Sequence, residues 1–164
     1  MKQVVIVRHG KAVPYGYDDD FNRDLQDRGK SDAALVSSEL NQRKVAPDLM
    51  ISSPAKRALK TARIFADNLG FSQNKIQEVE DIYDGLTTGE FVDLIRELPE
   101  NADTVFFFGH NPGFYYYVAN LLQSFHGDMP TTSTVGINFE VDDWKEVNAR
   151  TGSLAFHLVP RMLK

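Results

Sequence analysis

Two histidines and two arginines in this sequence follow short apolar runs, in positions where an α/β sheet gathers its functional side chains. Arg8 and His9 come directly after the run at 4–7, Arg57 comes shortly after the run at 48–51, and His110 comes shortly after the run at 104–108. Because the carboxyl ends of parallel strands form the ligand-binding edge of an open sheet, we expect these four side chains to converge on one site.

The four side chains together have the chemistry of a phosphoryl-transfer site. A guanidinium offers phosphate a planar fork of donors and keeps its charge near neutral pH. A neutral imidazole can attack phosphorus and form a phosphohistidine, and we expect the charges of Arg8 and Arg57 to lower the pKa of His9. Its other ring nitrogen then needs an acceptor such as a backbone carbonyl near Gly10. His110 would donate a hydrogen bond to the transferring group.

The elements that must position these residues follow from the alternation of short apolar runs with longer amphipathic stretches. Apolar runs without polar alternation predict strands buried on both faces, and the amphipathic stretches predict helices that cover them. The fold class expected is α/β, a three-layer α/β/α sandwich with a mostly parallel, partly mixed central sheet. The predicted strands are 4–7, 48–51, 104–108, 134–141 and 153–159, and the predicted helices are 30–43, 54–69, 88–98 and 114–125.

The helix predicted at 54–69 has the clearest signals. Ser53 suits its N-cap, Pro54 its first turn and Gly70 its end. Four apolar residues at helical spacing predict its buried stripe: Ala58, Ala62, Phe65 and Leu69. At the end of the helix predicted at 114–125, His126 is interpreted as a helix-terminal charge.

The composition narrows the classes of protein to which the chain can belong. Its 164 residues include 18 Lys and Arg against 23 Asp and Glu, a formal net charge of −5, which favours neither nucleic acid nor an anionic membrane as partner. The chain has no cysteine, so it has no disulfide, thiolate metal site or thiol nucleophile. No linker or repeat divides it, and we expect one domain over 1–164. Without an apolar run long enough for a membrane span or a signal peptide, a cytoplasmic protein is expected.

Three motifs resemble the signatures of the histidine phosphatase superfamily, which includes the phosphoglycerate mutases. They are Arg8-His9-Gly10, the segment Ser53 to Ala62 around Arg57, and Gly109-His110-Asn111-Pro112-Gly113. The small size, the segment Asn22-Arg23-Asp24-Leu25 and the ending Pro160 to Lys164 resemble its SixA-type phosphohistidine phosphatases.

The resemblance implies roles for individual residues. His9 would be the phosphorylated nucleophile, and Arg8, Arg57 and His110 would form the phosphate pocket. Arg23 matches a loop arginine that faces the phosphate. We also expect Gly10 and Asn111, which neighbour the two histidines, to bind substrate. No metal and no cofactor are expected.

The general acid is the least defined part of this prediction. Larger members of the superfamily use a carboxylate in the middle region, where this chain has Asp84 before Gly85. Asp84 is either that acid or an ordinary turn residue, and we favour the turn. A phosphoimidazole leaves more easily than an alkoxide and has less need of a proton. The charge run Asp18-Asp19-Asp20 is interpreted as a solvated loop, or as one that repels acidic ligands.

The preferred hypothesis is therefore a metal-independent hydrolase that dephosphorylates phosphohistidine in a protein. The chain lacks the long insertions that enclose small ligands, and an open site suits a protein surface. The alternative is a phosphatase for a small metabolite or phosphosugar. A phosphomutase and a non-catalytic phosphate-binding module rank lower, because the first needs a closed pocket and the second would not need a nucleophile.

Overall fold

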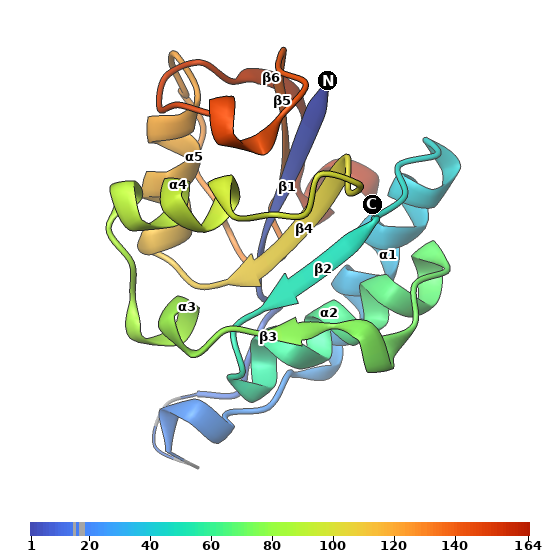
Figure 1. The fold of residues 1–164 in the computed structure, drawn as a ribbon. Helices are drawn as coiled ribbons and strands as arrows, with labels where there is room; N and C mark the ends of the chain where they lie inside the picture. The colour runs from blue at the N-terminus through green and yellow to red at the C-terminus, as the bar shows by residue number, and fades with distance from the viewer. Residues whose placement is uncertain (15, 17–18) are drawn as a thin grey trace.

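A mixed six-stranded sheet forms the centre of the molecule (Figure 1). The computed structural model describes residues 1–14, 16 and 19–164. In the described residues the strand order is β3-β2-β4-β1-β5-β6. The first four strands in this order are parallel to one another. Strand β5 is antiparallel to β1, and β6 is antiparallel to β5. The strands are β1 (Lys2–Arg8), β2 (Leu49–Ser52), β3 (Gln77–Glu78), β4 (Thr104–Gly109), β5 (Thr134–Phe139) and β6 (Ser153–Leu158).

Helices cover both faces of this sheet, which confirms the predicted three-layer α/β/α sandwich. One face packs on α1 (Asp27–Gln42) and α2 (Lys56–Leu69), and the other on α3 (Glu80–Asp84), α4 (Thr88–Arg96) and α5 (Gly113–Leu121). Four 3-10 turns complete the described elements: η1 (Asp20–Asn22), η2 (Gln73–Lys75), η3 (Trp144–Glu146) and η4 (Pro160–Leu163).

Strand β1 shows why its sequence is apolar without alternation. Val5 and Val7 belong to the core beside α1 and α2, whereas Val4 and Ile6 belong to the core beside α4 and α5. All four side chains are fully buried. A strand in the middle layer of a three-layer sandwich needs apolar residues on both faces, so the prediction that the run at 4–7 forms a strand buried on both faces is confirmed.

Several helix ends differ from the predictions. Helix α2 begins at Lys56 with Ala55 as N-cap, so Pro54 precedes the helix, and the Ser53 hydroxyl instead accepts a hydrogen bond of 3.1 Å from the Ala55 amide. The buried stripe of α2 is confirmed: Ala58, Ala62, Phe65 and Leu69 are all buried.

Helix α1 begins earlier than predicted, at Asp27, and α5 ends earlier, at Leu121. The interpretation of His126 as a helix-terminal charge was therefore wrong, because His126 lies in an exposed loop beyond the helix. None of the described helices is both long and apolar enough to cross a membrane.

Candidate active site

The carboxyl ends of β1 and β4 bring the two predicted histidines together. These strands are in register, with Arg8 opposite Gly109, and the amide of His9 donates to the Gly109 carbonyl at 3.0 Å. The ring centroids of His9 and His110 lie 5.3 Å apart. At the end of β2, the amide of Ser53 donates to the Phe108 carbonyl at 2.9 Å, so the three strand ends form one continuous edge.

Backbone contacts fix the orientation of the His9 ring. Nδ1 lies 2.8 Å from the carbonyl oxygen of Gly10, and because a carbonyl only accepts, Nδ1 carries the proton. The unprotonated nitrogen is then Nε2, whose lone pair is available for attack. Burial, together with the charges of Arg57, Arg8 and Arg23, lowers the pKa of His9 to about 4, although the Gly10 contact acts in the opposite direction. The predicted lowering of the His9 pKa and the predicted backbone acceptor for its other ring nitrogen are both confirmed. Burial, however, lowers this pKa more than the arginine charges do.

Gly10 positions His9 through its backbone. Its amide donates to the Thr61 hydroxyl at 3.0 Å, and that hydroxyl donates to the Arg57 carbonyl at 2.8 Å. A Cβ on Gly10 would lie only 2.9 Å from the carbonyl oxygen of Gly29, so no larger residue fits without a shift of α1. This amide is already engaged, and a direct contact between Gly10 and substrate stays a prediction.

His110 lies against Ser53 and Tyr83. Its Nε2 is 2.8 Å from the Ser53 hydroxyl, and the Tyr83 ring meets the imidazole edge-on at 5.6 Å between centroids. Burial, followed by the neighbouring His9 and Arg57, lowers the pKa of His110 to about 3. Nδ1 is buried without a partner among the described residues, so it is the ring nitrogen left for a ligand.

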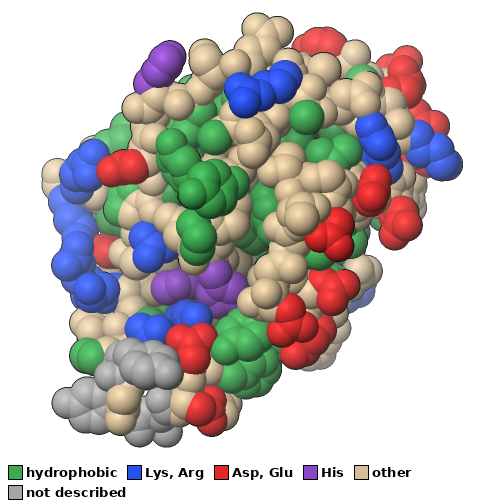
Figure 2. Space-filling model, turned by 90° about the vertical axis from the view of Figure 1, so that its left-hand side faces the viewer, with side chains coloured by type: hydrophobic (Ala, Val, Ile, Leu, Met, Phe, Trp, Pro, Cys, Tyr) green, Lys and Arg blue, Asp and Glu red, His purple; other side chains and the backbone are tan. Residues whose placement is uncertain are grey.

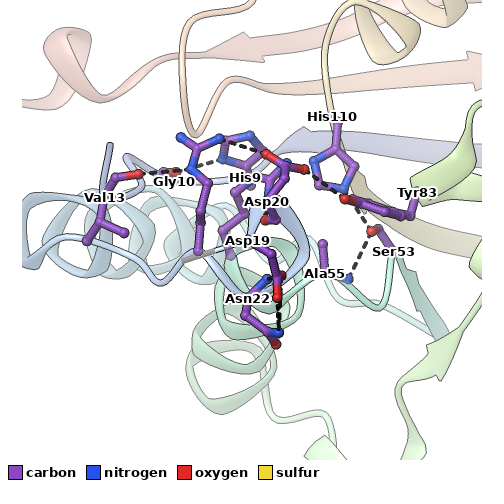
Figure 3. A network of polar contacts seen from close by, with 12 residues as sticks. His9, Gly10, Val13, Asp19, Asp20, Asn22, Ser53, Ala55, Tyr83 and His110 are labelled. Atoms are coloured by element: carbon purple, nitrogen blue, oxygen red, sulfur yellow. Dashed lines mark hydrogen bonds and ion pairs between the residues drawn. The ribbon is translucent and has the colours of Figure 1, made fainter. Parts of the chain in front are cut away.

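Arg57 and Arg23 both donate to the carboxylate of Asp20, a residue that was not predicted to belong to the site and that Figure 3 labels. Arg57, buried in the first turn of α2, donates through Nη1 to the Asp20 carbonyl at 2.6 Å and through Nη2 to its Oδ2 at 3.1 Å. Arg23 donates through Nη1 to Oδ1 of Asp20 at 2.9 Å and through Nε to the Val13 carbonyl at 3.0 Å. The interpretation of Asp20 as part of a solvated run was wrong; Asp18 lies outside the described residues.

Tyr83 completes the surroundings of Asp20, because its hydroxyl donates to Oδ2 at 2.8 Å. Partial burial by itself raises the pKa of the Asp20 carboxyl, but the hydrogen bonds from Tyr83, Arg23 and Arg57 outweigh burial and lower the pKa to about 2. Asp20 is therefore an anion at neutral pH. The neighbouring Asp84 is exposed at the end of α3, and its role as an acid stays a prediction.

Arg8 and Asn111 hold the segment that precedes β5. Arg8 Nη1 donates to the Met129 carbonyl at 3.0 Å, and Asn111 Nδ2 donates to the same oxygen at 2.9 Å. The amide of Thr132 donates in turn to the His9 carbonyl at 3.0 Å. Arg8 Nε and Asn111 Oδ1 are buried without partners among the described residues, which is a common feature of functional sites.

The space-filling view shows how charged side chains are distributed over one face of the molecule (Figure 2). Histidine side chains reach the surface next to Lys and Arg side chains, and Asp and Glu side chains gather on the opposite side of this view. Within the described part of the chain, no group of three or more His, Asp or Glu residues is arranged to hold a metal ion.

Comparison with known proteins gives this arrangement a family. A model of the histidine phosphatase superfamily (branch 1) matches residues 4–114, more than half of the chain. The chain belongs to the histidine phosphatase superfamily. The matched residues include all three motifs.

Two relatives by sequence show different degrees of coverage. Phosphoserine phosphatase 1 of Hydrogenobacter thermophilus is 31% identical over 100 residues, which cover 59% of this chain and 46% of that protein. The chain thus spans less than half of the length of this relative. An uncharacterised chloroplastic protein of Arabidopsis thaliana is 24% identical over 162 residues, 92% of this chain and 72% of that protein.

Solved structures show the same fold in SixA proteins. The protein histidine phosphatase SixA complexed with tungstate matches with a TM-score of 0.85 at 24% identity, over 99% of both chains. A SixA protein from Agrobacterium tumefaciens matches with a TM-score of 0.77 at 22% identity, over 97% of this chain and 98% of that one. These structures show that the chain shares the fold of the SixA proteins.

Proposed function

We propose that this protein is a metal-independent phosphatase that removes the phosphoryl group from phosphohistidine in a protein, through a phosphohistidine intermediate on His9. The observation that carries the proposal is the Nδ1 contact with Gly10, which leaves a neutral His9 with a free Nε2 lone pair under the influence of the Arg57, Arg8 and Arg23 charges. The SixA proteins that share the fold support the choice of substrate.

In the first step, Nε2 of His9 forms a bond to phosphorus while the bond from phosphorus to the substrate imidazole breaks. The departing imidazole nitrogen takes a proton from solvent. In the second step, water attacks phosphorus, the bond to Nε2 breaks, and inorganic phosphate leaves with His9 restored. Arg57, Arg23 and Arg8 stabilise the charge on the phosphoryl oxygens in both steps.

The role proposed for His110 is to donate from Nδ1 to a phosphoryl oxygen. This requires that the Ser53 hydroxyl donates to His110 Nε2, so that the ring proton stays on Nδ1. Ser53 is suited to this role because its oxygen already accepts from the Ala55 amide, which leaves the hydroxyl proton to bond elsewhere.

The state of the carboxylates supports a substrate with an easy leaving group. Asp20, the carboxylate that touches the arginines, is ionised and has no proton to give at neutral pH. An alkyl phosphate needs such a proton as its oxygen departs, whereas an imidazole departs with much less help.

A second candidate is a phosphatase for a small phosphomonoester such as phosphoserine. It is favoured by the phosphoserine phosphatase of Hydrogenobacter thermophilus, the relative that is 31% identical over part of the chain. In this case Asp84 would be the residue to examine as the proton donor.

The test compares kcat/KM for a phosphohistidine peptide with kcat/KM for a panel of small phosphomonoesters that includes phosphoserine. We expect the peptide to be preferred. In parallel, the protein is labelled with a phosphodonor, and we expect an acid-labile label on His9. His126→Ala is the matched control that should keep the label. A preference for one metabolite would establish the second candidate, and absence of any label or turnover would reject both.

A further inference from the structure

The carboxylate of Asp20 occupies the arginines that the proposed function assigns to phosphate. The two carboxylate oxygens accept hydrogen bonds from different guanidinium groups, Oδ1 from Arg23 and Oδ2 from Arg57. The backbone carbonyl of Asp20 accepts a second hydrogen bond from Arg57. Both terminal nitrogens of Arg57 are thus engaged by one residue. Because carboxylate and phosphate oxygens bond guanidinium groups with the same geometry, Asp20 has the chemistry of a ligand for this site.

The segment that carries Asp20 is secured by polar contacts. Asp19 caps η1 by accepting from the amide of Asn22 at 3.0 Å, and the Phe21 ring meets Tyr83 edge-on at 5.2 Å. None of the three residues of η1 is buried, and about a third of the Asp20 side chain is exposed to solvent. A segment with so few buried apolar contacts can move at little cost, and the strand ends need not move with it.

We infer that Asp20 is an internal ligand of the phosphate site, which competes with the phosphoryl group for Arg57 and Arg23 and returns when phosphate leaves. This inference rests on the proposed function for the identity of the competing anion. It gives Asp20 two effects during turnover. Asp20 weakens the binding of any phosphate-like anion, and it fills the arginine pair after hydrolysis, so that product phosphate is released rather than retained.

The Tyr83 hydroxyl helps to hold Asp20 on the arginines, since it donates to the same Oδ2 that Arg57 contacts. Replacement of Tyr83 by Phe removes this bond without changing any charge. Tyr83→Phe therefore separates competition by Asp20 from simple repulsion between Asp20 and an incoming anion.

The test measures the binding of inorganic phosphate to the intact protein by calorimetry, for the wild type, Asp20→Asn, Tyr83→Phe and a charge control. The control is Asp24→Asn, because Asp24 pairs with Lys60 and Lys56 and touches neither arginine. If nine-tenths of the wild-type molecules hold Asp20 on the arginines, Asp20→Asn binds phosphate about 10-fold more tightly. Tyr83→Phe should bind it roughly 2- to 5-fold more tightly, and Asp24→Asn should change binding less than either.

Equal or weaker phosphate binding by Asp20→Asn would overturn the inference. Tighter binding by Asp20→Asn with no gain in Tyr83→Phe would also overturn it, because repulsion alone would then explain the result. Thermal unfolding of each variant verifies that it is folded, and Tyr83→Phe keeps the test open if Asp20→Asn does not fold. Since phosphate binding needs no turnover, loss of the proposed enzymatic activity would be recognised separately, by the substrate panel.

Discussion

Two parts of the site are held in place by different forces. The strand-end group, Arg8, His9 and His110, lies where β1 and β4 pair, and backbone hydrogen bonds from His9 to Gly109 and from Thr132 to His9 fix it. The loop group, Asp20 and Arg23, is fixed mainly by contacts between polar side chains. We therefore propose that the chemistry depends on the strand-end group, whereas the loop group adjusts the affinity for phosphate and its release.

The largest expected effect comes from removal of the nucleophile in the strand-end group. His9→Ala should lower kcat/KM by at least ~10³-fold, because the covalent route is lost. The measurement is turnover of a phosphohistidine peptide, with His126→Ala as the control that should keep wild-type activity. A His9→Ala enzyme with more than a tenth of the wild-type rate would show that another residue attacks phosphorus.

The second prediction compares Arg57 of helix α2, which contacts the loop group, with Arg23 of the loop group. Arg57→Gln should lower kcat/KM by ~10²- to 10³-fold. The reason is that the guanidinium is buried, so water screens its interaction with the phosphoryl group only weakly. Arg23→Gln should lower it only about 10-fold, because its more exposed charge is better screened. Steady-state kinetics on both variants decides the order, and a greater loss in Arg23→Gln would reverse the roles assigned to helix and loop.

The third prediction concerns pH and the buried imidazole. The pKa of His9 is about 4 in the fold and about 6.5 in an unfolded chain, so the unfolded state binds more protons between these values. The stability that the neutral ring contributes is complete above pH 6.5 and is lost as the pH falls towards 4, by up to ~3 kcal/mol.

Urea unfolding at pH 7 and pH 5 measures this effect. His9→Gln should lose less stability between the two pH values than the wild type does. It should still lose some, because His110 has a pKa of about 3 in the fold and contributes in the same direction. Identical losses in both proteins would contradict the lowered pKa of His9.

The fourth prediction tests the close approach behind the strand-end group. Gly10→Ala should lower the free energy of unfolding by ~1–3 kcal/mol, because its Cβ meets the Gly29 carbonyl and α1 must shift. Gly89→Ala in α4 is the matched control, because a Cβ on Gly89 would have its nearest neighbour, Thr87 Oγ1, at 3.9 Å. The control should be stabilised by ~0.5–1 kcal/mol, as alanine favours a helix.

The smallest expected effect concerns metal. Both groups supply positive charge through arginines, so prolonged treatment with a chelator should leave kcat/KM unchanged. Loss of activity that is restored by added Mg²⁺ or Zn²⁺ would reject the metal-independent mechanism.

The sequence predicted the strand-end group well and the loop group only in part. Arg8 and His9 directly follow one apolar run and His110 comes shortly after another. This local pattern, together with the rule for parallel strand ends, was enough to place the three residues on one edge. Asp20 escaped prediction because its partners Arg57 and Tyr83 lie 37 and 63 residues away in the sequence, and a run of three aspartates favours a solvated interpretation.

Tyr83 and Ser53 were missed for related reasons. Tyr83 lies in the short helix α3, whose five residues are too few to show helical periodicity. Ser53 was assigned to the N-cap of α2, and no local signal indicates that its hydroxyl meets His110 from another strand. Contacts made across the sheet depend on the register of non-adjacent segments, which local sequence patterns do not contain.

The Thr61 hydroxyl, which joins the Gly10 amide to the Arg57 carbonyl, has a wider consequence. Through this hydroxyl, Arg57 and the proposed nucleophile His9, whose ring contacts Gly10, are both anchored on α2. One turn of this helix therefore sets their spacing. Sequence changes in the outer loops can then alter which substrates reach the site without changing the distance between the His9 ring and Arg57.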